Sequence, residues 1–294
     1  MSLFEVELMV AEVTTRQNKS VREHSDVPDY ANPVEVIQCH ARELLEKSGI
    51  ANPPFLPERY AHLQGIKKIT KTDLGRIDAL LIRLEDGYEV KLNVLRHPVR
   101  QNFSLAHEIA HTFFMNRDMK PDNTTAKLDS CSEGNISTEE ALCNIGAAEL
   151  LMPEVTFKLY AEKSGFSIRS IWPLARTFQT SIVATTIRFI EMASEPCLAI
   201  AWTFREGPNS SKRKLRILWS HQPSKKTNKD SFFIPYKKSV KDDSMIYEAY
   251  NSDNVIADFE LLSLGNLKGR YYIESKGFSY GARRYVLSLV FLER

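Results

Sequence analysis

The five residues from His107 to His111, His-Glu-Ile-Ala-His, constrain this chain more than any other stretch of its sequence. Two histidines four positions apart lie on one face of an α-helix, one turn from each other, where both imidazoles can bind a single zinc ion. Glu108, between them, would then lie beside a water on that metal. Apolar residues recur at helical spacing through the same segment: Phe103, Ala106, Ile109, Ala110 and Phe113. We therefore expect a core helix over about 102–115 that carries a metal site.

The two histidines need a further partner, because a catalytic zinc usually has three protein ligands and one open position. Glu139 and Glu140 are the candidates, on a helix predicted over 137–151. We favour Glu140, because Asn144 lies one turn further on the same face and could hydrogen-bond a metal-bound histidine. A capping box, Ser137-x-x-Glu140, is the alternative interpretation, in which the glutamate binds the first amide of the helix.

Two blocks of sequence extend these motifs. The first block is Arg100-x-x-Phe103-Ser104-x-Ala106-His107-Glu108-x-x-His111. The second block is Glu140-x-x-x-Asn144-x-x-Ala147-Ala148-x-Leu150-Leu151-Met152-Pro153. Together they resemble the ImmA/IrrE metallopeptidases. The resemblance implies zinc as the cofactor, His107, His111 and Glu140 as its ligands, and Glu108 as the catalytic base.

Three positions depart from the pattern of that family. Gly146 stands where phenylalanine is common, Cys143 where alanine is common, and Ala110 where glycine is frequent just before the second histidine. These departures concern local packing more than chemistry.

The predicted elements indicate an α+β fold with four regions. Residues 1–32 lack sustained periodicity and predict an irregular N-terminal arm. Residues 33–153 contain a helix, a small antiparallel sheet and the active-site helix, and the resemblance implies a zincin-like peptidase domain. Residues 154–195 predict a helical pair with the spacing of a helix-turn-helix. Residues 196–294 are rich in strands and are similar in position and size to the α/β GAF-like sensor domain of the larger family members.

Particular signals mark the elements of these regions. Pro33 and Gly49 delimit the first helix, a short helix is expected near 58–64, and Asp86-Gly87 indicates a hairpin. The strands predicted before the metal motif are Ile66–Thr70, Ala79–Leu84 and Tyr88–Leu95. Those predicted in the last region are Cys197–Phe204, Leu215–Ser220, Ser231–Pro235, Arg270–Glu274 and Tyr285–Leu292.

Composition restricts the location and the class of the protein. No run approaches the roughly 18 apolar residues of a membrane span, and the segment from Met1 to His24 lacks the pattern of a signal peptide. We expect a cytoplasmic protein without a membrane partner. Its four cysteines form no CxxC pair, which fits reduced thiols. The net charge of +2 is too small to predict nucleic-acid binding by the chain as a whole.

Two segments are candidates for nucleic-acid binding. The second helix of the helical pair offers Arg188 as its only cation, which favours a packed structural element over a recognition helix. Ten cations lie between residues 212 and 241, among four aromatic residues. Cations with aromatics suit single-stranded DNA, and a solvated surface is the alternative. The candidates for this binding are Lys212, Arg213, Lys214, Arg216, Lys225 and Lys226.

Cys131 lies in a polar stretch before Glu140. Because a thiolate is a strong zinc ligand, Cys131 could occupy the open metal position and inhibit the enzyme until the stretch withdraws. The alternative is an incidental thiol. Peptide hydrolysis also needs a donor for the developing oxyanion, and His97, Arg100 and Tyr160 all stay candidates.

The predicted function is that of a zinc-dependent endopeptidase that cleaves a specific regulatory protein. The resemblance implies a helix-turn-helix transcriptional repressor as the substrate and DNA damage or foreign DNA as the signal. The C-terminal domain would sense that signal, with single-stranded DNA as a candidate effector. The alternative is a non-catalytic DNA-binding transcriptional regulator that uses a peptidase-like domain for docking.

Overall fold

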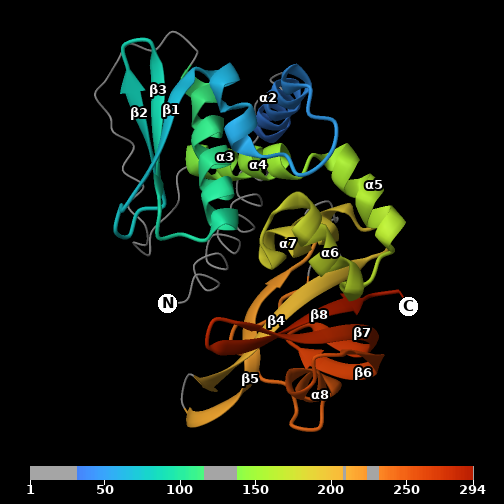
Figure 1. Ribbon diagram of the computed structural model, residues 1–294. Coiled ribbons are helices and arrows are strands. Elements are labelled where there is room, and N and C mark those ends of the chain that lie inside the picture. Colours follow the sequence, from blue (N-terminus) through green and yellow to red (C-terminus); the bar gives the residue numbers. More distant parts are fainter. Residues whose placement is uncertain (1–31, 116–137, 208–209, 224–231, 294) are drawn as a thin grey trace. The chain divides into compact units, whose positions relative to one another are not determined.

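A computed structural model describes residues 32–115, 138–207, 210–223 and 232–293 of the chain (Figure 1). The described residues form two compact units. The first unit comprises residues 32–115, 138–157 and 175–181. The second comprises residues 158–174 and the described residues from Ile182 onward.

The first unit begins with helix α2, Pro33–Ser48, and the signals that start and stop it are local. The side chain of Asn32 caps the helix by accepting a hydrogen bond from the amide of Val34 at 3.1 Å. Proline suits the first turn because its missing N–H has no partner there in any case. Gly49 ends the helix in the left-handed conformation, with φ of 69°. The prediction of this helix from Pro33 and Gly49 is confirmed.

The sheet of the first unit contains β1 (Ile66–Thr72), β2 (Ala79–Leu84) and β3 (Gly87–Asn93), in the order β1-β3-β2. The strands β2 and β3 form the expected antiparallel hairpin, but β1 pairs with β3 in parallel. The prediction of an antiparallel sheet is therefore wrong. Residues 73–78 carry the chain from β1 to β2, and β1 pairs with the far strand of the hairpin instead of with its chain neighbour. The helix expected near 58–64 is two 3-10 turns, Pro57–Arg59 and Ala61–Gln64.

Two helices pack against each other beside this sheet, α3 (Pro98–Met115) and α4 (Thr138–Leu151) (Figure 1). The helix α3 begins at Pro98, four residues before the predicted start, since proline fits the first turn. Its middle turns are buried on every side, from Ser104 to Thr112. The helix α4 is buried along most of its length and shares an apolar cluster with α2: Val34, Ile37, Leu142 and Ile145.

Gly146 lies where α4 approaches both other helices. A Cβ atom added at this glycine would lie 3.1 Å from the Cβ of Ala110 on α3 and 3.0 Å from Cγ1 of Ile37 on α2. These separations are shorter than ordinary van der Waals contact. The absence of a Cβ atom at Gly146 therefore allows α4 to lie close to α3.

Asp78 connects the sheet to the start of α3. Its Oδ1 accepts a hydrogen bond from Arg96 at 2.5 Å, and its Oδ2 accepts one from Nε of Arg100 at 2.9 Å. Both arginine side chains are largely buried.

We expect Asp78→Asn to lower the free energy of unfolding by about 1–3 kcal/mol, because it leaves two shielded guanidinium groups without a charged partner. Urea denaturation measures this change. The matched control is Asp86→Asn, which removes an exposed pair with Lys67 at 4.0 Å and should cost only about 0–1 kcal/mol. Equal effects of the two substitutions would contradict the structural role of Asp78.

The second unit is built on a five-stranded antiparallel sheet with the order β5-β4-β8-β7-β6. Its strands are β4 (Cys197–Gly207), β5 (Ser210–His221), β6 (Val255–Leu264), β7 (Leu267–Tyr280) and β8 (Arg283–Phe291). Helices α5 (Glu154–Ser164) and α6 (Ile168–Phe178) each contribute residues to both units, and α7 (Ile182–Met192) belongs to the second.

The two faces of this sheet carry different helices. Leu198, Ile200 and Trp202 alternate along β4 and face the apolar core beneath α8 (Met245–Asn251). The intervening Ala199 and Ala201 are also buried, and α7 contacts β4 (Figure 1). Residues 232–235 do not form the strand predicted there, whereas β6 and α8 were not predicted. The GAF-like assignment of this unit stays a prediction.

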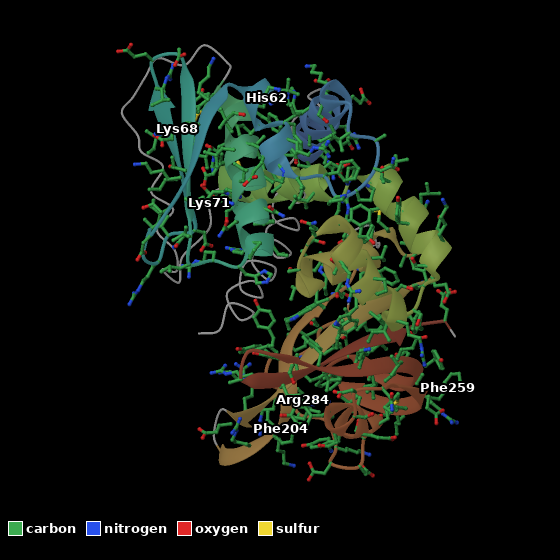
Figure 2. All side chains as sticks on the ribbon, viewed as in Figure 1. His62, Lys68, Lys71, Phe204, Phe259 and Arg284 are labelled. Carbon is green, nitrogen blue, oxygen red and sulfur yellow. The ribbon has the colours of Figure 1, made fainter. Side chains whose placement is uncertain are left out.

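Helix α8 is held at both ends by side chains from the sheet. Glu260 accepts hydrogen bonds from the hydroxyl of Ser244 at 2.5 Å and from the amide of Met245 at 2.9 Å. At the other end, Arg284 donates to the carbonyl oxygens of Tyr250 and Ser252, and the ring of Phe204 packs against that of Tyr250 (Figure 2). These contacts fix a short helix that has little intrinsic stability.

Helix α7 is not exposed in the manner of a DNA-recognition helix. Its only cation, Arg188, is buried, together with six of its other residues. This burial supports the interpretation of the helical pair as a packed element. Within the described residues, no helix is both long enough and apolar enough to span a membrane.

Candidate metal centre

Three candidate ligands come from the two packed helices of the first unit. His107 and His111 lie one turn apart on α3 and are almost fully buried. Glu140 lies in the first turn of α4. Because the middle of α3 is enclosed by protein, the two imidazoles are shielded from bulk water.

The side chains of these residues converge on one point. The Nε2 atoms of His107 and His111 are 3.1 Å apart. The carboxylate of Glu140 lies 3.1 Å from Nε2 of His107 and 3.4 Å from Nε2 of His111. Ligands of a tetrahedral zinc at 2.0–2.1 Å lie about 3.3 Å from one another. The donor set and its spacing therefore fit a zinc ion.

The other ring nitrogens also have partners, and both come from α4. Nδ1 of His107 lies 3.0 Å from Oδ1 of Asn144. Nδ1 of His111 lies 3.1 Å from Oε1 of Glu139. Of the two glutamates considered from the sequence, Glu140 thus faces the converging Nε2 atoms, and Glu139 faces the opposite side of the His111 ring.

Cys143 belongs to a second group of potential ligands around His111. Atoms of His111, Glu139 and Cys143 all lie within 4.8 Å of one another. The Cys143 thiol is fully buried, and burial raises its pKa. Sequence reasoning missed this contact, although Cys143 is four residues from Glu139 and therefore shares its helical face.

Glu108 is 2% exposed and lies between the two histidines. Burial raises the pKa of its carboxyl group, while the positive charge of His107 and His111 acts in the opposite direction. A carboxylate with a raised pKa accepts a proton more readily than a solvated one, which suits a general base.

Protonation of His111 depends on its neighbours in the metal-free protein. Burial alone would lower the pKa of His111, but hydrogen bonds with Cys143 and Glu140 outweigh it and raise the pKa to about 11. The pKa of Glu140 is lowered: burial opposes this shift, but hydrogen bonds with His107 and His111 outweigh it. Metal-free His111 therefore carries an additional proton at neutral pH.

We expect zinc binding to release about one proton from His111, because zinc binds the neutral imidazole. Because zinc competes with this proton and the pKa of His111 lies well above this range, the apparent affinity should increase about tenfold per pH unit between pH 6 and 8. Calorimetry in buffers of different ionisation enthalpy measures the release. The control is His62→Asn, an exposed histidine that is not among these candidate ligands (Figure 2). Heats that do not depend on the buffer would contradict the prediction.

Other residues predicted for the site have different positions. Arg100, a candidate oxyanion donor, is bound by Asp78, and His97 is exposed just before α3. Tyr160 belongs to the other compact unit. Cys131 lies outside the described residues, so its inhibitory role stays a prediction. Ser137 also lies outside them, and the side chain of Glu140 faces the histidines.

The basic residues proposed for DNA binding are only partly described. Lys225 and Lys226, and the side chain of Lys212, lie outside the described residues. The other three contact the protein itself. Arg213 donates to the carbonyl oxygen of Phe204 at 3.1 Å, Lys214 pairs with Asp242 at 3.7 Å, and Arg216 donates to the carbonyl oxygens of Arg205 and Lys237.

Helix α3 carries two buried histidines with a glutamate between them, and α4 supplies an acidic side chain as the third donor. This arrangement is typical of a metallopeptidase domain. The comparison with protein families agrees: residues 65–189 match the IrrE N-terminal-like domain. The chain thus contains a domain that resembles the IrrE N-terminal-like family, over less than half of its length.

Two relatives carry the name radiation response metalloprotease IrrE. The protein from Deinococcus deserti is 28% identical over 190 residues, which is 61% of this chain and 64% of that protein. The protein from Deinococcus radiodurans is 29% identical over 111 residues, which is 37% of this chain and 33% of that protein. The chain thus matches less than two thirds of the length of either relative.

A solved structure also resembles this chain. It is a transcriptional regulator from Mycobacterium tuberculosis, with a TM-score of 0.53 and 14% sequence identity. The match covers 96% of this chain and 80% of that one. At this identity, the similarity concerns the fold alone.

Proposed function

We propose that this protein is a zinc-dependent endopeptidase that cleaves a specific regulatory protein. The observation that carries the proposal is the convergence of His107, His111 and Glu140, at 3.1–3.4 Å from one another, beside the buried Glu108. The two relatives named as metalloproteases support the same activity.

Each residue of the site has a distinct task in this proposal. Zinc held by His107, His111 and Glu140 would polarise the scissile carbonyl and lower the pKa of a water to about 7. Glu108 takes a proton from the attacking water and delivers it to the nitrogen of the leaving amine. Asn144 accepts the Nδ1–H of His107 and so keeps the Nε2 lone pair directed at the metal.

The substrate and the signal belong to the same proposal. We take the substrate to be a helix-turn-helix transcriptional repressor that is cleaved after DNA damage or on entry of foreign DNA. The C-terminal unit would sense the signal. Its binding of single-stranded DNA is supported by Tyr236, which is 49% exposed and lies beneath the cations of Arg205 and Lys237. Cations gathered at such an exposed aromatic side chain can neutralise the phosphates of a passing strand. We also place the protein in the cytoplasm, as the sequence predicts.

The test is incubation of the zinc-loaded full chain with helix-turn-helix repressors encoded near its gene, with and without single-stranded DNA. We expect one repressor to be cut at a single site, which mass spectrometry of the fragments identifies. The matched control is Glu108→Gln, which should leave the repressor intact. If no repressor is cut under either condition, the non-catalytic regulator becomes the better interpretation. That regulator would act equally well with either residue at position 108.

A further inference from the structure

We infer that Glu139 is a positioning residue that holds His111 in the orientation and tautomer needed to bind zinc. The inference rests on the proposed zinc site, but it concerns a residue that contacts the metal only through the imidazole. The observation is the 3.1 Å separation between Oε1 of Glu139 and Nδ1 of His111.

The two nitrogens of the His111 ring face different groups. Nε2 lies among the converging donors, 3.1 Å from Nε2 of His107 and 3.4 Å from the carboxylate of Glu140. Nδ1 faces Glu139 on the other side of the ring. Because a carboxylate only accepts hydrogen bonds, it selects the tautomer with a proton on Nδ1 and leaves the Nε2 lone pair free.

Glu139 and Asn144 perform parallel tasks on the same helix. Asn144 accepts from Nδ1 of His107 at 3.0 Å, and Glu139 accepts from Nδ1 of His111 at 3.1 Å. One acceptor is a neutral amide and the other carries a charge. A negative charge on the far side of the ring makes imidazole a more basic ligand, so His111 should bind the metal more strongly than a histidine held by an amide.

Exposure limits the size of this effect. The side chain of Glu139 is 54% exposed, so water screens the interaction of its charge with His111. The side chain of Asn144, by contrast, is buried. Loss of such an outer contact usually weakens metal binding about 10–100-fold, and we expect the lower part of that range. Cys143 also lies near His111, but a thiol is a weaker acceptor than a carboxylate.

The experiment measures the zinc affinity of the full chain by competition with a chromophoric chelator. We expect Glu139→Ala to raise the dissociation constant about tenfold and Glu139→Gln to raise it less, because the amide oxygen still accepts from Nδ1. Glu46→Gln, an exposed change of the same charge on α2, should leave the dissociation constant within about twofold of the original.

A purely structural role predicts a different pattern. It would lower the thermal stability of the metal-free protein and would not shift the visible absorption of the cobalt-substituted site, which reports ligand orientation. We expect that shift in Glu139→Ala.

Two results would overturn the inference. One is an unchanged zinc affinity in Glu139→Ala. The other is binding of two zinc ions per chain that falls to one in Glu139→Ala, which would make His111, Glu139 and Cys143 a second metal site. A zinc affinity that depends on Glu139 in a protein that cuts no repressor would instead leave this inference intact and reject the proposed peptidase.

Discussion

Replacement of Glu108 by glutamine is expected to reduce the rate of peptide cleavage by about 10²–10⁴-fold, while the zinc content stays unchanged. Glutamine keeps the size and shape of the buried side chain, so the packing of α3 is preserved. It cannot accept the proton of the attacking water. The loss should therefore appear in the rate constant and not in the amount of metal bound.

Three measurements test this prediction. Zinc content by mass spectrometry and thermal unfolding establish that Glu108→Gln is folded and loaded. Cleavage of the identified repressor under single-turnover conditions gives the rate. Glu46→Gln, on the exposed face of α2, should cleave at the original rate. A Glu108→Gln protein that cleaves normally would show that Glu108 is not the base.

Removal of the Glu140 side chain is expected to weaken zinc binding more than about 100-fold and to abolish cleavage at physiological zinc concentrations, since loss of even an outer contact costs about 10–100-fold. Glu140 supplies the only negative charge among the three candidate ligands. Its pKa is lowered by hydrogen bonds with both histidines, so the group is ionised and ready to bind at neutral pH.

The same variant distinguishes a ligand from a helix cap. If Glu140 only capped α4, Glu140→Ala would cost about 0.5–2 kcal/mol of stability and leave zinc affinity unchanged. We expect the opposite result in equilibrium dialysis and urea denaturation. Glu139→Ala is the matched comparison, because it removes the neighbouring carboxylate from the same turn and should weaken binding far less.

Helices α2 and α3 could be predicted because the sequence signals that define them are local. Helical spacing of apolar residues indicated α3, and Pro33 with Gly49 delimited α2. The approach of α4 to α3 is not local. It was inferred from a family resemblance and from the spacing of Glu140 and Asn144, which suggested that both residues face the histidines.

Pairing between distant strands was the main source of error. Nothing in the sequence of β1 states which edge of the β2–β3 hairpin it joins, so its parallel pairing could not be derived from periodicity. The strand β6 was missed for another reason. It is an edge strand in which Phe259 and Leu261 are exposed, which blurs the alternation of apolar and polar residues that marks a half-buried strand.

Glu139 illustrates a further limit of prediction from the sequence. The sequence places two glutamates side by side, and their spacing to the histidines cannot say which nitrogen each one faces. Only the rotation of α4 about its own axis decides that Glu140 faces Nε2 and that Glu139 faces Nδ1. This rotation depends on the packing of the whole helix.

The close approach of Gly146 to Ala110 gives two positions without any chemistry of their own control over the metal centre. A Cβ atom at position 146 would lie only 3.1 Å from the Cβ of Ala110 and 3.0 Å from Cγ1 of Ile37, so α4 would have to shift to admit it. Glu139, Glu140 and Asn144 all belong to α4. A single enlargement at position 110 or 146 would therefore carry all three side chains away from the imidazoles at once.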